Sequence, residues 1–161
     1  MFVQKGIRME QQGQPEQTRV YPACRGVRGA TIASGDSREE IHAATRELVI
    51  EMMRTNGIDR DDLVGAFFTT TSDLTAAYPA EAARLMGWEY VPMLGAVEMD
   101  KQGGPSRCIR VMLLWNTTKG PREIKHIYLK GTESLRTVGA SEVAPAHEAN
   151  PTNNQRKDGE R

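Results

Sequence analysis

The feature that most constrains this chain is its longest apolar run, Cys108-Ile109-Arg110-Val111-Met112-Leu113-Leu114-Trp115, which holds a single arginine. A continuous apolar run with β-branched residues at its centre predicts a strand that is buried on both faces of a sheet. An unpaired guanidinium at such a place would be costly, so Arg110 needs a partner. No acid lies near it in sequence. The partner is therefore a distant carboxylate of the protein or an anionic ligand.

Length, charge and cysteine content restrict the class of protein. The 161 residues predict one domain. The 21 basic and 21 acidic residues give a net charge of zero, which argues against binding to nucleic acid. No apolar stretch approaches the roughly 18 residues of a membrane span. Cys24 and Cys108 form neither a disulfide framework nor a zinc motif, so we expect a reduced cytoplasmic protein without a metal.

The two ends of the chain differ in composition from its middle. Residues 1–18 are polar and aperiodic, with several glutamines, and residues 138–161 have the same character. Such segments lack the apolar side chains that would offset the entropy cost of folding. We therefore predict a disordered N-terminal extension over 1–18, one folded domain over 19–137, and a disordered C-terminal tail over 138–161.

One helix is well marked within the predicted domain. Ser37 and Glu40 have the spacing of a capping box, and Gly57 after Asn56 is typical of a helix C-terminus. An apolar stripe at helical spacing lies between them, formed by Ile41, Ala44, Leu48 and Met52. His42 falls beside this stripe, and we expect it on the surface.

The remaining elements are shorter. Strands are predicted over residues 21–32, 63–70 (largely buried), 90–97, 107–115 and 126–130. Pro79 is allowed in the first turn of a short helix that ends at Gly87. Residues 121–124 indicate a helical turn. The order β-α-β-α-β-β-β predicts a mixed α/β domain, without an internal repeat.

Four polar residues on or beside these strands are candidates for a site. Arg28 lies among glycines and an alanine, which leave room for a ligand, and Arg110, Tyr128 and Glu98 complete the set. Each also has a structural interpretation: a solvated arginine, a core ion pair, a surface tyrosine and a turn acid. Together they fit a small molecule with carboxylates, and an arginine can also stabilise charge that develops during a reaction.

Other kinds of site have little support in the sequence. The three histidines, His42, His126 and His147, are widely separated, and none stands in a recognisable pattern with a nucleophile. The pair Gly103-Gly104 lacks both the glycine spacing and the lysine-serine ending of a phosphate-binding loop.

Six ordered segments with compatible spacing carry a family resemblance. They are Arg25-Gly26-Val27-Arg28-Gly29-Ala30-Thr31, Tyr78-Pro79-Ala80, Gly87-Trp88-Glu89-Tyr90-Val91-Pro92, Glu98-Met99-Asp100, Cys108-Ile109-Arg110-Val111-Met112 and His126-Ile127-Tyr128-Leu129. Through them the chain resembles the monofunctional chorismate mutases of the Bacillus type. The resemblance implies rearrangement of chorismate to prephenate, in phenylalanine and tyrosine biosynthesis. It also implies a mixed-sheet α/β fold, a homotrimeric pseudo-α/β-barrel with active sites between subunits, and no cofactor.

The resemblance also implies roles for individual residues. Arg110 would lie beside the ether oxygen of the breaking C–O bond, where negative charge develops, so that Arg110 and Glu98 form the catalytic pair. Glu98 would accept a hydrogen bond from the substrate hydroxyl, and Arg28 and Tyr128 would hold a substrate carboxylate. Further positions would line the pocket or its entrance: Tyr78, Ala80, Arg84, Met93, Leu94, Gly95, Leu135 and Arg136.

Two positions depart from the family pattern. Gly95 stands where the best-known member has cysteine, so a side-chain contact is lost. Glu81 replaces a lysine near the entrance, which should weaken the attraction of a dianion. Two other hypotheses stay open. The protein could be a non-catalytic trimeric module of related fold that binds small carboxylates, or Arg110 could form a purely structural ion pair.

Overall fold

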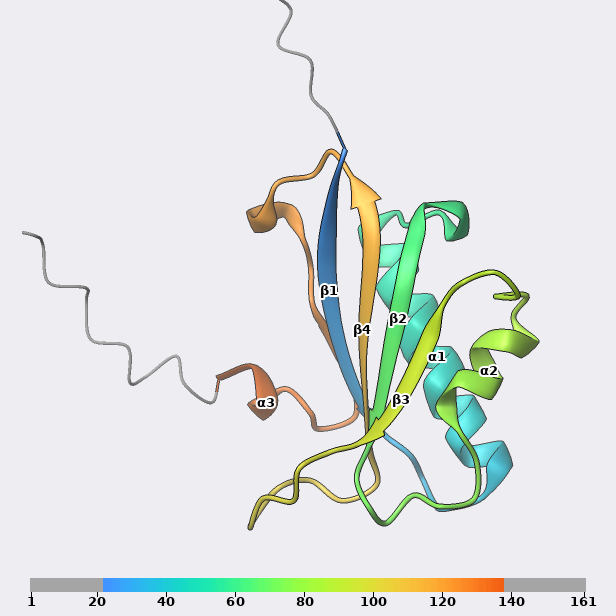
Figure 1. Ribbon diagram of the computed structural model, residues 1–161. Coiled ribbons are helices and arrows are strands. Elements are labelled where there is room, and N and C mark those ends of the chain that lie inside the picture. The colour runs from blue at the N-terminus through green and yellow to red at the C-terminus, as the bar shows by residue number, and fades with distance from the viewer. Residues whose placement is uncertain (1–21, 138–161) are drawn as a thin grey trace, which may run out of the picture.

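One five-stranded mixed sheet, with two helices against one of its faces, organises the computed structural model, which describes residues 22–137 (Figure 1). The strands are β1 (Ala23–Ile32), β2 (Leu63–Thr70), β3 (Met93–Val97), β4 (Cys108–Thr117) and β5 (Ile127–Tyr128). The α-helices are α1 (Arg38–Asn56), α2 (Pro79–Leu85) and α3 (Ser134–Thr137), with 3-10 helices at Arg60–Asp62 and Pro121–Glu123. The predicted α/β class is confirmed.

Strand β4, the apolar run, lies at the centre of the sheet. The strand order is β3-β2-β4-β1-β5, with β4 antiparallel to both β1 and β2. The outer strands are each parallel to their neighbour, β3 to β2 and β5 to β1. Within this register Arg110 pairs with Ala30 on one side and with Thr69 on the other. Arg110 is therefore flanked by residues from two distant parts of the chain.

Helix α1 begins and ends as the sequence predicts. The Ser37 hydroxyl accepts a hydrogen bond from the Glu40 backbone N–H at 3.2 Å and donates one to the Glu40 carboxylate at 2.8 Å. Gly57 ends the helix at φ 64°, in the left-handed region that glycine adopts without steric cost. Among the buried residues of α1 are the four of the predicted stripe.

The core forms where α1 crosses the sheet. Leu48 and Met52 of α1 are fully buried, and they approach β1 where Gly29 has no side chain. A Cβ atom on Gly29 would lie 2.4 Å from the Met52 sulfur and 3.0 Å from a Leu48 methyl. Each fully buried apolar side chain contributes about 1.5–3 kcal/mol. The absent side chain of Gly29 thus sets how closely helix and sheet pack.

The predicted burial of β4 on both faces is wrong. Beyond Cys108, which is also buried, its buried residues alternate and face the core beneath α1: Ile109, Val111, Leu113 and Trp115. Met112 is 39% exposed on the opposite face, and the Arg110 side chain is 48% exposed. Both helices α1 and α2 pack against one face, so alternate residues of an antiparallel strand remain uncovered in the single chain. Strand β2, expected to be largely buried, is also only partly so, with Phe67 exposed between the buried Ala66 and Phe68.

Smaller differences between the predicted and the observed structure concern the ends of strands, one additional helix and the burial of His42. Strand β3 begins at Met93, after Pro92, and β5 is limited to two residues, while α3 was not predicted. His42 is buried rather than exposed. The predicted disordered segments, 1–18 and 138–161, lie outside the described residues. Within residues 22–137 no helix is long and apolar enough to cross a membrane.

The contact at Gly29 generates a stability prediction. Gly29→Ala should lower the free energy of unfolding by about 1–3 kcal/mol, because a methyl group there forces buried side chains to shift. Gly26→Ala on the same strand is the matched control, since its nearest heavy atom would be 3.7 Å away. Urea unfolding followed by circular dichroism measures both variants. Equal midpoints for the two would contradict the predicted contact.

Candidate active site

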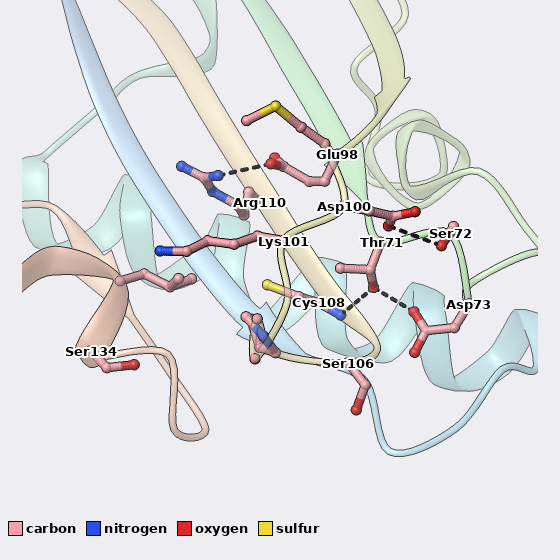
Figure 2. A pocket seen from close by; sticks show the side chains of 15 residues that line it. Thr71, Ser72, Asp73, Glu98, Asp100, Lys101, Ser106, Cys108, Arg110 and Ser134 are labelled. Carbon is pink, nitrogen blue, oxygen red and sulfur yellow. Dashed lines mark hydrogen bonds and ion pairs between the residues drawn. The ribbon is translucent and has the colours of Figure 1, made fainter. Parts of the chain in front are cut away.

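Arg110 and Glu98 form an ion pair at the edge of the sheet face that α1 and α2 leave uncovered, which we call the helix-free face. Glu98 follows the end of β3, and its Oε2 accepts a hydrogen bond from the Arg110 guanidinium at 2.8 Å. Figure 2 shows the two side chains pointing toward one another. Thr69 of β2 donates a hydrogen bond to the other Glu98 oxygen. The carboxylate is thus fixed from both sides, while the guanidinium has five N–H donors and gives one to Glu98.

Arg28 and Tyr128 lie on the same face of the sheet. Arg28 pairs with Met112, and Ala30 pairs with both Arg110 and Tyr128, so the small Ala30 separates the two functional side chains. A cavity of about 380 Å³ lies among them. We call it the outer-face cavity; its lining includes Arg28, Phe67, Thr69, Glu98, Arg110 and Tyr128. The four residues that the sequence put forward first are brought together here.

A second cavity, of about 720 Å³, lies on the helix side of β2 and β3. We call it the helix-side cavity. Among the residues predicted to line the pocket, it contains Tyr78, Ala80, Arg84, Met93 and Gly95. Arg38 and Glu81 also line it. Gly95 leaves open space, because a Cβ atom there would meet only the Phe68 carbonyl oxygen at 3.8 Å.

The two cavities lie on opposite faces of the sheet. Phe67 and Thr69 of β2 line the outer-face cavity, whereas Phe68 and Thr70 line the helix-side cavity. Successive side chains of a strand point to opposite faces. The two cavities share no lining residue. Most of the predicted site residues are therefore divided into two groups that a single copy of the chain does not join.

Three predicted pocket residues fall outside both groups. Leu94 pairs with Phe67 on the outer side of β3 and is 65% exposed. Leu135 of α3 lines a third cavity, of about 490 Å³, whose lining also includes Glu98, Lys101 and Arg110 (Figure 2). Arg136 is exposed on α3. Leu135 therefore reaches the surroundings of Arg110, whereas Leu94 lies apart.

A neighbouring histidine, His126, lies in the positive potential around Arg28. The Arg28 backbone N–H donates a hydrogen bond to His126 Nδ1 at 3.1 Å. Partial burial lowers the pKa of His126 below its ordinary value, and the positive charges of Arg28 and Arg136 lower it further. Arg136, although it lines none of these three cavities, thus adds to the positive potential beside Arg28.

The other ionisable groups near Arg110 do not supply a nucleophile. Burial raises the pKa of the Cys108 thiol to about 11, so it stays protonated at neutral pH. In residues 22–137 no cluster of three or more histidine, cysteine, aspartate or glutamate side chains could hold a metal ion. What the site offers is preorganised positive charge with one fixed carboxylate.

Sequence reasoning missed Thr69, Phe67 and Arg38. Thr69 and Phe67 flank the buried Phe68 of β2, so a strict period-two assignment would have placed them on the face away from the core, although only the register brings Thr69 beside Arg110. Arg38 gave no such signal, because it follows a helix cap and its neighbour in space, Glu81, lies on another helix.

Comparison with known proteins identifies the family of this chain. The model of the family described as chorismate mutase type I matches residues 24–138. The chain is 46% identical over 113 residues to the chorismate mutase AroH of Thermus thermophilus, covering 70% of this chain and 93% of that relative. It is 41% identical over 113 residues to the chorismate mutase AroH of Bacillus subtilis, covering 70% of this chain and 89% of that relative.

A solved structure agrees with the sequence comparisons. The chorismate mutase from Clostridium thermocellum Cth-682 matches with a TM-score of 0.67 and 44% identity, over 69% of this chain and 99% of that one. The chain belongs to the chorismate mutase type I family.

The electrostatics of the site predict a measurable titration. In Arg28→Met, the pKa of His126 should rise toward its ordinary value of 6.5, because a positive charge beside the ring is removed. Arg25→Met is the control, since Arg25 instead bonds the Lys119 carbonyl. An NMR pH titration of the histidine Cε1–H signals measures the shift, and an unchanged pKa would contradict the proximity of the two charges.

The same group predicts how stability depends on pH. Because the folded-state pKa of His126 lies below 6.5, the unfolded chain binds more protons in the window between the two values. The free energy of unfolding therefore includes the full contribution of His126 above pH 6.5. This contribution is lost as the pH falls from 6.5 through the folded-state pKa of His126. Arg28→Met should narrow this window.

Proposed function

We propose that the protein is a chorismate mutase, an isomerase that rearranges chorismate to prephenate in phenylalanine and tyrosine biosynthesis, with Arg110 as the principal catalytic group. Membership of the chorismate mutase type I family supports the reaction. The single observation that carries the residue assignment is the outer-face cavity, where Arg110, paired with Glu98, faces Arg28 and Tyr128.

The proposed chemistry requires no proton transfer. Within one substrate molecule a C–O ether bond breaks while a C–C bond forms, so atoms and electrons balance without a co-reactant. Negative charge builds on the ether oxygen as the C–O bond lengthens. An arginine already held in place beside that oxygen lowers the barrier, because it binds the transition state more strongly than the substrate.

Glu98 and Thr69 prepare Arg110 for this task. The ion pair at 2.8 Å keeps the guanidinium directed into the cavity, and Thr69 restrains the second carboxylate oxygen. Glu98 has further lone pairs, so it can also accept a hydrogen bond from the substrate hydroxyl. Arg28 and Tyr128 supply an N–H fork and an O–H donor for a substrate carboxylate.

We further propose that the complete active site forms between copies of the chain in a homotrimer. The two groups of predicted site residues lie on opposite faces of the sheet, so one copy alone does not close a pocket. Edge strand β3 and the helix-free face expose apolar side chains, including Phe67, Leu94, Val97 and Met112. Exposed apolar surface of this kind is typical of an interface. A cytoplasmic location stays a prediction.

Replacing Arg110 tests the catalytic assignment. Arg110→Met should lower kcat by about 10²–10³-fold or more, the usual effect of removing a preorganised charge donor. Its melting temperature should change by no more than about 4 °C, because half-exposed ion pairs contribute little to stability. Chorismate loss is followed by absorbance, with Arg25→Met as control.

Three results would contradict this assignment. Retention of kcat within about threefold in Arg110→Met would exclude Arg110 as the principal catalytic group. Tight binding of chorismate by the wild-type protein without turnover would favour the non-catalytic binding module. A large loss of stability with unchanged kcat would assign Arg110 to a structural ion pair.

Mixing two inactive variants tests the shared site. Arg110→Met disables the outer-face cavity, and Gly95→Trp fills the helix-side cavity where a Cβ atom meets no close contact. After joint refolding at equal amounts, about a quarter of the sites in a random trimer combine two intact halves, so about a quarter of the wild-type activity should return. No recovery in mixed trimers would mean that both halves belong to one copy.

A further inference from the structure

We propose that Arg38, held by Glu81, is a substrate-binding residue at the entrance of the active site and supplies the positive charge that position 81 lacks. The inference rests on the proposed function and extends it to a residue outside the family positions. Arg38 is the first residue of α1, and Glu81 lies in the first turn of α2. Both line the helix-side cavity, together with Arg84 and Tyr78.

The contact between Arg38 and Glu81 is short and directed. One guanidinium nitrogen of Arg38 donates a hydrogen bond to Glu81 Oε2 at 2.6 Å. The Arg38 side chain is 58% exposed and the Glu81 side chain 27% exposed. Arg38 therefore uses one of its five donors for the pair, and the exposed remainder of its guanidinium is available at the cavity.

Stability does not explain an arginine at this place. The N-terminal end of a helix carries partial positive charge, which disfavours a cation in the first turn, where acids such as Glu39 and Glu40 are favoured. An exposed ion pair of this kind adds little to the stability of the fold. The location of Arg38 is better explained by what its charge does at the cavity.

Glu81 acts as a positioning residue for Arg38. His42, one helical turn after Arg38, also lies beside this carboxylate, with Nε2 3.3 Å from the same oxygen although Nε2 makes no hydrogen bond. The His42 side chain is 11% exposed, so the Glu81 carboxylate packs against a largely buried ring while it accepts the hydrogen bond from Arg38. Its carboxylate is directed at Arg38 and less at an entering substrate.

The charges of the two cavities together fit a dianion. The residues that carry charge are Arg28, Arg110 and Glu98 in the outer-face cavity, and Arg38, Arg84 and Glu81 in the helix-side cavity. Four arginines against two glutamates leave an excess of two positive charges, equal to the two carboxylates of chorismate. Without Arg38 this excess would be one. Arg38 thus offsets the negative charge of Glu81 in the helix-side cavity.

The experiment measures kcat and KM for chorismate at several salt concentrations. In Arg38→Ala, KM should rise about 3- to 10-fold with kcat changed by less than about twofold, because the charge acts in binding. The salt dependence of kcat/KM should also become weaker than in the wild type, because one attracting charge is lost. A purely structural pair would move neither quantity.

A charge exchange provides the rescue. Arg38→Glu places two acids side by side and should raise KM more than Arg38→Ala does. Adding Glu81→Lys restores both the ion pair and a cation at the entrance, so KM of the double variant should return to within about threefold of the wild type. The matched control is Arg54 with Glu51, an ion pair of 2.7 Å at the other end of α1, where the same exchange should leave KM unchanged.

The outcomes separate the two levels of the argument. If the wild-type protein leaves chorismate unchanged, the proposed function is wrong and the role of Arg38 falls with it. If the wild type is active and Arg38→Ala has the KM and salt dependence of Arg54→Ala, the role of Arg38 alone is wrong. A lower melting temperature in Arg38→Glu that the exchange restores, with KM constant throughout, would likewise overturn it.

Discussion

The packing of α1 against one face of the sheet is the constraint on which the rest of the molecule depends. Leu48 and Met52 approach β1 closely enough that Gly29 must lack a side chain. This contact decides which alternate residues of β4 are buried. Since Val111 lies under the helix, Arg110 must point to the other face. The position of the charged site is therefore a consequence of apolar packing.

Arg110 has a partner, but the pair is not a buried salt bridge. Glu98 meets it at 2.8 Å with both side chains partly exposed, so neither charge bears the full cost of removal from water. Such a pair adds little stability and keeps the guanidinium oriented. A charge that is oriented in advance is what a transition state with growing negative charge requires, because the protein does not have to reorganise during the reaction. The ion pair thus fits a catalytic function better than a structural one.

In the function proposed here a single chain would not be a complete enzyme, because most of the predicted site residues are divided between the two faces of the sheet. The outer-face cavity contains the groups for charge stabilisation. The helix-side cavity is lined by Arg84 and has open space at Gly95. The apolar side chains exposed on β3 and on the helix-free face give a physical reason for copies to associate. Association would then bury apolar surface and join the half-sites in one step.

The sequence by itself determined most of the helices and strands and put forward the candidate site residues. Its capping box, its helical stripe and its apolar run depend on local spacing, and six ordered segments indicated the family. The tertiary structure decided which side of the sheet each residue faces and which acid meets Arg110. An apolar run is compatible with burial on one face or two, because the run does not specify what packs against it. Likewise, the contacts of Thr69 with Glu98 and of Arg38 with Glu81 join residues far apart in the chain, so only the folded arrangement of strands and helices brings them together.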